Sequence, residues 1–226
     1  MICQCESCHL KTLFYSSIRL DEIEGYCSSR REIGVKAGED LIKQGEEIRD
    51  FIYLKEGLVK LYRKSDNGQI QIIRFGKPFD FVSLLSVFSD DKYNYSVSAI
   101  EDSVACVFDL SEIKQLILTN GAFAMHLIEI QNRASDLIIM NTLDLLQKRL
   151  YGRVASVLLY FAIEIYKSDE FELPISRKEI AQYIGMSIEN VIRVISAFRK
   201  DKIIQVYGKN LAILDRERLE RMRDLS

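Results

Sequence analysis

The amino-acid sequence predicts an α+β protein with a mainly β N-terminal part, one long helix and a helical C-terminal module. Three observations support this prediction. Short runs of β-branched and aromatic residues, separated by glycines, fill much of the first half of the 226-residue chain. A long stretch without proline follows, and the last quarter holds two amphipathic helical patterns joined by a glycine. The hydrophobic content of 48% is ample for buried cores.

The N-terminal part shows the alternation of half-buried strands. Six of the eleven glycines fall between Gly34 and Gly76 and separate short runs in which apolar and polar residues alternate. The turn Asp66-Asn67-Gly68 lies between two such runs, as in a β-hairpin. We therefore expect a compact antiparallel barrel or sandwich up to about residue 110. The alternating apolar positions are Ile52, Leu54, Val59, Leu61, Ile70, Ile72, Val97, Ala99, Val104, Cys106 and Phe108.

The middle of the chain predicts a long helix. No proline occurs between Glu112 and Lys167, and apolar residues recur at spacings of three and four. Such a stripe is typical of a coiled-coil seam between two subunits, in which a polar Asn141 would favour one register. The alternative is a helix that packs on its own β-domain. The stripe consists of Leu127, Ile130, Ala134, Leu137, Asn141 and Leu145. After Gly152, residues 153–166 predict a second, mostly buried helix.

The C-terminal module predicts a helix-turn-helix. Ser176 and Glu179 form a capping-box pattern at the start of one helix, and Gly185 supplies the turn that ends it. Ser187 then caps a second helix, on which Ile188, Val191, Ile195 and Phe198 fall on one face and are expected to pack inward. Two short strand patterns around the sequence Tyr-Gly-Lys-Asn at 207–210 add a hairpin. The combination is a winged helix.

A winged helix of this kind predicts DNA binding through its second helix. Arg193 can make a bidentate contact to a guanine edge, and Glu189 can accept from a cytosine amino group or hold Arg193 in place. Lysines and arginines around the helix would contact phosphates. The alternative is a module for protein contacts, with Glu189 and Arg193 as a surface ion pair. The predicted DNA-contacting residues are Ser187, Glu189, Asn190, Ile192, Arg193, Ser196, Arg177, Lys178, Arg199, Lys200 and Lys209.

The charge distribution supports a local DNA-binding surface. Net charge is −2, but residues 174–226 hold 11 Lys and Arg against 7 Asp and Glu, a net charge of +4 that leaves −6 for the rest. The sequence lacks a membrane-spanning run and a secretory signal, and its five irregularly spaced cysteines do not suggest a disulfide framework. We therefore expect a cytoplasmic protein with reduced thiols and no membrane partner.

The whole chain resembles the Crp/Fnr family of bacterial transcription regulators. The most specific segment is "SRKEIAQYIGMSIENVIRVISAF", in which Glu189 and Arg193 match the base-reading positions of the family. Ile192 stands where the Fnr branch has a serine, and it can offer only apolar contact, for example to a thymine methyl. The resemblance implies a jelly-roll type antiparallel β-roll at 1–118, a long dimerisation helix at 119–150 and a winged helix-turn-helix at 151–226. It also implies a homodimer on pseudo-palindromic DNA and contact with RNA polymerase.

The resemblance to the cyclic-AMP branch fails at the ligand. That branch uses a Gly-Glu pair and an Arg-Ser/Thr pair, and the corresponding positions here are Ser83-Leu84 and Tyr93-Asn94. The carboxylate and the guanidinium are both missing, so a cyclic phosphate would be left without its counter-charge. We therefore do not expect cyclic AMP to bind at these four residues, although they mark the effector pocket.

The Fnr branch binds a [4Fe–4S] cluster through three N-terminal cysteines and one in the β-roll. The resemblance implies Cys5 and Cys8 as the first two ligands and Cys106 as the one in the β-roll. Phe14 stands where the third N-terminal cysteine is expected, so Cys3 or His9 would have to substitute. Cys3, Cys5, Cys8 and Cys106 are therefore the candidate metal ligands. Zinc binding, thiol redox sensing and no sensory role remain open, and Cys106 alone is equally a small buried apolar residue.

These observations predict a sequence-specific DNA-binding transcription regulator, controlled by a signal at the β-roll or the N-terminal cysteines. The competing classes are a ligand-binding module and a metal-dependent enzyme on the β-roll. A metal-dependent enzyme usually needs several histidines, and residues 30–110 contain none, so we do not expect an enzyme.

Overall fold

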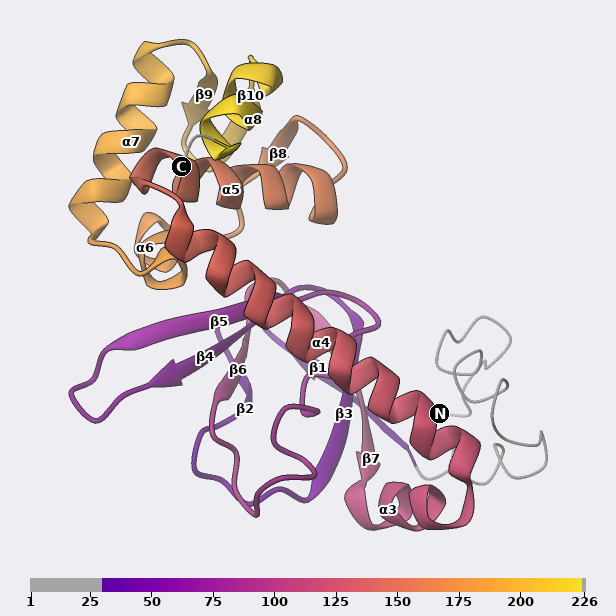
Figure 1. Cartoon of the computed structure of the whole chain (residues 1–226). Helices are drawn as coiled ribbons and strands as arrows, with labels where there is room; N and C mark the ends of the chain where they lie inside the picture. Colours follow the sequence, from indigo (N-terminus) through magenta and orange to yellow (C-terminus); the bar gives the residue numbers. More distant parts are fainter. Residues whose placement is uncertain (1–29, 225–226) are drawn as a thin grey trace. The chain divides into compact units, whose positions relative to one another are not determined.

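The computed structural model describes residues 30–224 (Figure 1). The chain divides into two compact units, one within residues 1–68 and 73–137 and the other within residues 69–72 and 138–226. Each unit is described by itself. In the described part of the chain, no helix has both the length and the apolar run that crossing a membrane requires.

Seven short strands form the β-roll of the first unit. One antiparallel sheet has the order β1-β7-β3, and the other has the order β2-β6-β4-β5. This arrangement confirms the antiparallel β-domain that the alternation predicts. The strands are β1 (Arg31–Val35), β2 (Asp40–Ile42), β3 (Asp50–Glu56), β4 (Val59–Lys64), β5 (Ile70–Gly76), β6 (Ser96–Ala99) and β7 (Ser103–Asp109).

Strands β3 and β7 are buried on both faces of the β1-β7-β3 sheet. Successive residues of a strand point to opposite sides, so each strand contributes to two core layers. Ile52 and Leu54 of β3 face the other sheet, together with Ala105 and Val107 of β7. The intervening residues of β3 and β7 pack on the opposite face against helices. The β-roll therefore has two core layers that share one sheet. The intervening residues are Phe51, Tyr53, Cys106 and Phe108.

Two helices cover the outer face of this sheet. Helix α3 (Leu110–Thr119) begins at the N-cap Asp109, whose carboxylate accepts a 2.7 Å hydrogen bond from the Ser111 backbone N–H. Helix α4 (Gly121–Gln147) follows after Asn120, whose side chain accepts from the Phe123 backbone N–H at 3.0 Å. The observed helix lies within the predicted range 119–150.

The apolar stripe predicted on α4 begins on its own β-roll. Leu127 is buried in the layer between the sheet and the helices, and Ile130 packs against that layer. Leu137 is 59% exposed and Asn141 is also exposed. The first half of the stripe therefore packs on the β-domain of its own chain, as the alternative interpretation predicts. A different set of apolar side chains on α4 is exposed: Met125, Ile128, Ile139, Leu143 and Leu146.

The second unit contains the predicted helix-turn-helix and hairpin. Its three-stranded antiparallel sheet has the order β8-β10-β9, and α5 packs against α6, α7 and α8. Strand β8, the π-helical turn η2 and helix α8 are elements that the sequence did not predict. The elements are α5 (Leu150–Tyr160), η2 (Phe161–Ile165), β8 (Glu170–Glu172), α6 (Arg177–Ile184), α7 (Ile188–Lys200), β9 (Ile204–Tyr207), β10 (Asn210–Ile213) and α8 (Arg216–Asp224).

Candidate DNA-binding site

Local sequence signals fix the helix-turn-helix. The Ser176 hydroxyl accepts from the Glu179 backbone N–H at 3.2 Å, and the Glu179 carboxylate accepts from the Ser176 backbone N–H at 2.8 Å. This is the predicted capping box of α6. Gly185 ends the helix in the left-handed region with φ of 66°, where a residue without a Cβ is favoured. Ser187 caps α7 two residues later and accepts from the Asn190 backbone N–H at 3.3 Å.

Helix α7 separates a buried face from an exposed face. Val191, Ile195 and Phe198 are buried as predicted, and Val194 joins them. The prediction that Ile188 packs inward is wrong, because its side chain is 37% exposed. The reason is its position as the first residue of the helix, where the preceding turn does not continue the buried face. Glu189, Ile192, Arg193 and Ser196 are exposed, as expected.

The two predicted base-reading residues lie one helical turn apart and have different partners. The Arg193 guanidinium donates to the Asn190 side-chain oxygen at 2.9 Å. The backbone N–H of Glu189 and the Ser187 hydroxyl hold the pKa of the Glu189 carboxyl below its ordinary value. Glu189 is therefore an ionised acceptor at neutral pH, and Asn190 is the residue that holds Arg193.

The predicted phosphate contacts surround α7. Lys178 lies in the first turn of α6, and Arg199 and Lys200 occupy the last turn of α7; all three are exposed, while Arg177 is half-buried. Lys209 lies in the hairpin turn, where its ammonium is 3.7 Å from a carboxylate oxygen of Glu172 on β8. Both side chains of this pair are well exposed, so the pair is weak and easily exchanged for another partner.

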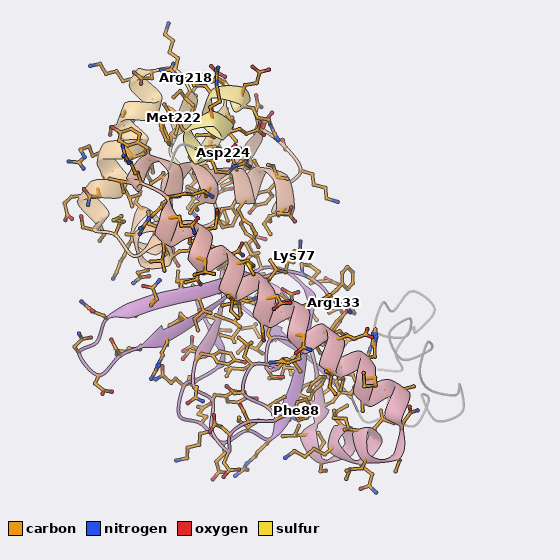
Figure 2. All side chains as sticks on the ribbon, in the orientation of Figure 1. Lys77, Phe88, Arg133, Arg218, Met222 and Asp224 are labelled. Atoms are coloured by element: carbon orange, nitrogen blue, oxygen red, sulfur yellow. The ribbon has the colours of Figure 1, made fainter. Side chains whose placement is uncertain are left out.

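Two further features of the site were missed by the sequence reasoning. Tyr207 at the tip of the β9–β10 hairpin is 82% exposed and carries a hydroxyl that can donate to a phosphate. Arg218 on α8, labelled in Figure 2, is the second feature. Its guanidinium donates to the backbone oxygen of Asp201 at 3.3 Å, and Asp201 is the C-cap of α7. Helix α8 therefore braces the end of α7. The composition of α8, rich in arginine and glutamate, gave no indication of this contact.

Arg153 on α5 is a third residue that the sequence reasoning missed. Its guanidinium donates to three backbone carbonyl oxygens, those of Leu146 at 3.3 Å, Lys148 at 2.9 Å and Ile184 at 3.1 Å. The first two carbonyls lie at the end of α4 and the third at the end of α6. Carbonyls at helix ends lack donors within their own helix and carry partial negative charge, which suits a guanidinium. Arg153 therefore joins the last turn of α4 to the helix-turn-helix.

Two of the four residues assigned to an effector pocket, Ser83 and Tyr93, form hydrogen bonds with the protein backbone. The Ser83 hydroxyl is buried and accepts from the Ile52 backbone N–H at 2.9 Å, and the Tyr93 hydroxyl donates to the Asp50 backbone oxygen at 3.1 Å. Burial raises the pKa of Tyr93 well above its ordinary value. Leu84 packs in the layer next to the helices, whereas Tyr93 packs between the sheets. Asn94 is exposed. The structure does not bring these four side chains together.

Of the four predicted metal ligands, Cys106 lies within the described residues. Cys3, Cys5 and Cys8 lie outside the described residues. Cys106 is fully buried in the layer between the β1-β7-β3 sheet and the helices, among apolar side chains. Within residues 30–224, no group of three or more His, Cys, Asp or Glu is placed to hold a metal ion. Among the described residues Cys106 supplies one thiol, and an iron–sulfur cluster is usually held by four thiolates.

Two domain families match separate parts of the chain. The model of the cyclic nucleotide-binding domain matches residues 32–120, and the model of the Crp-like helix-turn-helix domain matches residues 152–222. The transcriptional activator protein FnrA of Stutzerimonas stutzeri is 26% identical over 93% of this chain and 88% of its own length. The transcriptional activator protein Anr of Pseudomonas protegens is 27% identical with the same coverage.

Solved structures show the same fold. FixK2 from Bradyrhizobium japonicum superposes with a TM-score of 0.75 at 22% identity, covering 85% of this chain and 96% of its own. A regulator of the crp/fnr family from Eubacterium rectale gives a TM-score of 0.79 at 19% identity, covering 93% and 97% of the two chains. The two domain models, the named relatives and the shared fold lead to one conclusion: the chain belongs to the Crp/Fnr family and is a DNA-binding transcription regulator.

Proposed function

We propose that this regulator acts as a homodimer whose two α7 helices read the half-sites of one pseudo-palindromic DNA sequence. The observation that carries the proposal is the exposed pair Glu189 and Arg193 in the first turns of a helix that is capped at Ser187 and buried on its opposite face. The N-terminal residues of such a helix are the ones that contact base edges, and the half-sites of a dimer lie about 34 Å apart.

Each side chain of the pair suits one partner of a G·C base pair. Arg193 can donate two hydrogen bonds to the O6 and N7 atoms of guanine, and the ionised Glu189 can accept from the N4 amino group of cytosine. The hydrogen bond from Arg193 to Asn190 limits the conformations of the arginine before DNA is bound. Less side-chain entropy is then lost on binding, which favours the specific complex.

The surrounding cations orient the helix without reading sequence. Lys178, Arg199 and Lys200 are exposed at the two ends of the helix-turn-helix and can contact phosphates on either side of the groove. Lys209 can exchange its exposed partner Glu172 for a phosphate. Binding to any DNA should therefore weaken steeply as salt is raised.

The exposed apolar face of α4 supports the homodimer. Met125, Ile128 and Ile139 repeat at intervals consistent with one face of the helix, and each is more than half exposed. Leu143 and Leu146 continue this face in the last turns. An apolar face of this length on a long helix is typical of a surface that pairs with a second copy. We therefore assign the dimer contact to this face rather than to the stripe through Asn141 and Leu145.

The remaining parts of the proposal concern control. The domain bounds 1–118, 119–150 and 151–226 separate a sensor, a dimer helix and a DNA-binding module. A signal at the β-roll or at the N-terminal cysteines would act on α4, and the bonds of Arg153 to the ends of α4 and α6 would pass a shift to the helix-turn-helix. The activator names of FnrA and Anr support contact with RNA polymerase as the output.

Selection of the preferred site from random DNA, followed by affinity measurements at fixed salt, tests the base-reading role. We expect Arg193→Ala to weaken binding to the selected site by about 10- to 100-fold, since a bidentate contact contributes about 1–3 kcal/mol of discrimination. Binding to random DNA should change little. Arg221→Ala on α8 removes the same charge from an exposed position and is the matched control. Equal losses on both DNAs for Arg193→Ala would contradict base reading.

A further inference from the structure

Two isoleucines form an exposed ridge on α7. Ile188 is 37% exposed and Ile192 is 47% exposed. Residues four apart lie on the same face of a helix, so the two side chains stand one above the other. Ile188 follows the N-cap Ser187 directly, which places the ridge in the first two turns. We call Ile188 and Ile192 the isoleucine ridge.

The isoleucine ridge runs beside the row formed by Glu189 and Arg193. Each residue of the ridge precedes one residue of that row, so a surface that meets Glu189 and Arg193 also meets the isoleucines. The first turns of α7 are the part expected to enter the major groove. Lys178 in the first turn of α6 and the pair Arg199 and Lys200 in the last turn of α7 are exposed cations. They match a polyanion and not an apolar protein surface.

The major groove offers one apolar group to such a ridge. Among the four base-pair orientations, only those with thymine present a methyl group there, and apolar side chains are its usual contacts. Isoleucine has no donor or acceptor, so it would leave the edges of the other bases without hydrogen-bond partners. The chemistry of the ridge therefore selects thymine at the positions that it covers.

We propose that the isoleucine ridge reads the 5-methyl groups of two thymines in each half-site, beside the base pair that Glu189 and Arg193 contact. The proposal rests on the proposed entry of α7 into the major groove. Four residues of helix rise by about 6 Å. Base pairs are stacked about 3.4 Å apart, so the two methyl groups should lie roughly two base-pair steps apart.

The test uses the full-length protein and a site selected from random DNA at fixed salt. Each thymine of the site is replaced in turn by deoxyuridine, which removes only the methyl group, and the dissociation constant is measured. We expect replacement at two positions of each half-site to weaken binding roughly three- to fivefold, which is the effect of losing one buried methyl group. Replacement at other positions should have no effect.

Variants of the protein assign each methyl group to one isoleucine. Ile188→Ala should abolish the effect of deoxyuridine at one of the two positions, and Ile192→Ala should abolish it at the other. Leu214→Ala is the matched control, because Leu214 is 54% exposed at the end of β10 and lies outside the ridge. This variant should keep both effects.

The outcomes separate this proposal from the proposed function. If deoxyuridine has no effect at any position of a well-bound selected site, or if both effects persist in the two alanine variants, the methyl-reading role is wrong while the regulator still reads DNA. If selection yields no preferred site, base reading by α7 fails as a whole. Even if an alanine variant folds poorly, the deoxyuridine measurements on the unaltered protein show whether thymine methyl groups contribute to binding, and no effect at any position overturns the proposal.

Discussion

Arg193 donates a 2.9 Å hydrogen bond to the side-chain oxygen of Asn190, three residues earlier on α7. The i,i+3 spacing places both side chains on neighbouring parts of the helix surface. The sequence leaves Glu189 two roles, to accept from a cytosine amino group or to hold Arg193. In the structure Asn190 holds Arg193, while the backbone N–H of Glu189 and the Ser187 hydroxyl interact with the Glu189 carboxylate. Each of the two side chains proposed to read bases therefore has its own supporting partners.

Removal of the Asn190 side chain should reduce specificity more than affinity for random DNA. Without its acceptor, Arg193 has more conformations to lose on binding, and we expect Asn190→Ala to weaken binding to the selected site by roughly fivefold, the equivalent of one hydrogen bond. The ratio of specific to random-DNA affinity at fixed salt is the measurement. Gln205→Ala, at an exposed position of β9, is the control. An unchanged ratio for Asn190→Ala would show that Arg193 needs no support.

Arg153→Lys should loosen the link between α4 and the helix-turn-helix. A lysine ammonium is a compact charge that cannot reach the carbonyls of Leu146, Lys148 and Ile184 in the fork geometry of a guanidinium. We expect a loss of about 1–3 kcal/mol in the free energy of unfolding, measured by denaturant titration, together with weaker specific DNA binding. Arg149→Lys, at an exposed neighbouring position, should be neutral. A stability loss of the same size in both variants would point to a general effect of the substitution.

Gly185→Ala should destabilise the turn between α6 and α7. A Cβ added at this position would point into open space, so the cost comes from the φ of 66° alone. We expect a loss of about 1 kcal/mol, seen as a lower midpoint of thermal unfolding. Gly185→Asn should cost less, since asparagine tolerates the left-handed region better than alanine. If asparagine and alanine cost the same, backbone conformation is not the cause.

Charges on the exposed apolar face of α4 should dissociate the proposed dimer. Ile139 and Leu143 lie one turn apart on this face, and a carboxylate at either position would face its counterpart in the partner across an apolar seam. We expect the double variant Ile139→Glu and Leu143→Glu to sediment as a monomer. Leu118→Glu introduces a charge at a leucine of α3 that is 86% exposed, and it should leave the dimer intact. A dimeric double variant would exclude this face as the contact.

Cys106 should behave as a small packing residue. Its side chain is fully buried among apolar neighbours, so Cys106→Ala should cost about 1 kcal/mol in the free energy of unfolding, comparable to the loss of one buried methyl group. We expect the variant, purified without oxygen, to keep the iron, sulfide and zinc content of the unaltered protein. Loss of iron and sulfide from the variant would instead identify Cys106 as a cluster ligand and support the cluster predicted from Cys3, Cys5 and Cys8.

The sequence predicted those parts of the site that depend on local signals. The capping box at Ser176, the turn at Gly185 and the cap at Ser187 each involve residues that are close in sequence, and the structure confirms all three. The alternation also identified buried positions of β3 and β7, although Val104 of β7 is only half-buried. It could not show that the β1-β7-β3 sheet has a core on both faces, because that depends on which element covers each face.

The features that the sequence did not predict depend on how helices meet and on where a helix begins. The positions of the three carbonyls that Arg153 contacts depend on how α4, α5 and α6 meet. No sequence pattern around Arg153 predicts these contacts. Ile188 has the correct spacing for the buried face of α7, but its place at the helix start leaves it partly uncovered. On α4 the spacing identified an apolar stripe, but it could not say that Leu127 packs on its own β-roll.

Burial of β7 on both of its faces makes the register of this strand unusually intolerant of change. Inserting or deleting a single residue within β7 would exchange the side chains of its two faces, so that Cys106 and Phe108 would turn toward the other sheet while Ala105 and Val107 would turn toward the helices. Large and small side chains would then be misplaced in two cores at once. In contrast, the exposed turn at Asp66 to Gly68 can change length without moving a buried residue. Length variation among functional relatives of this chain should therefore be concentrated in such turns and be absent from β7.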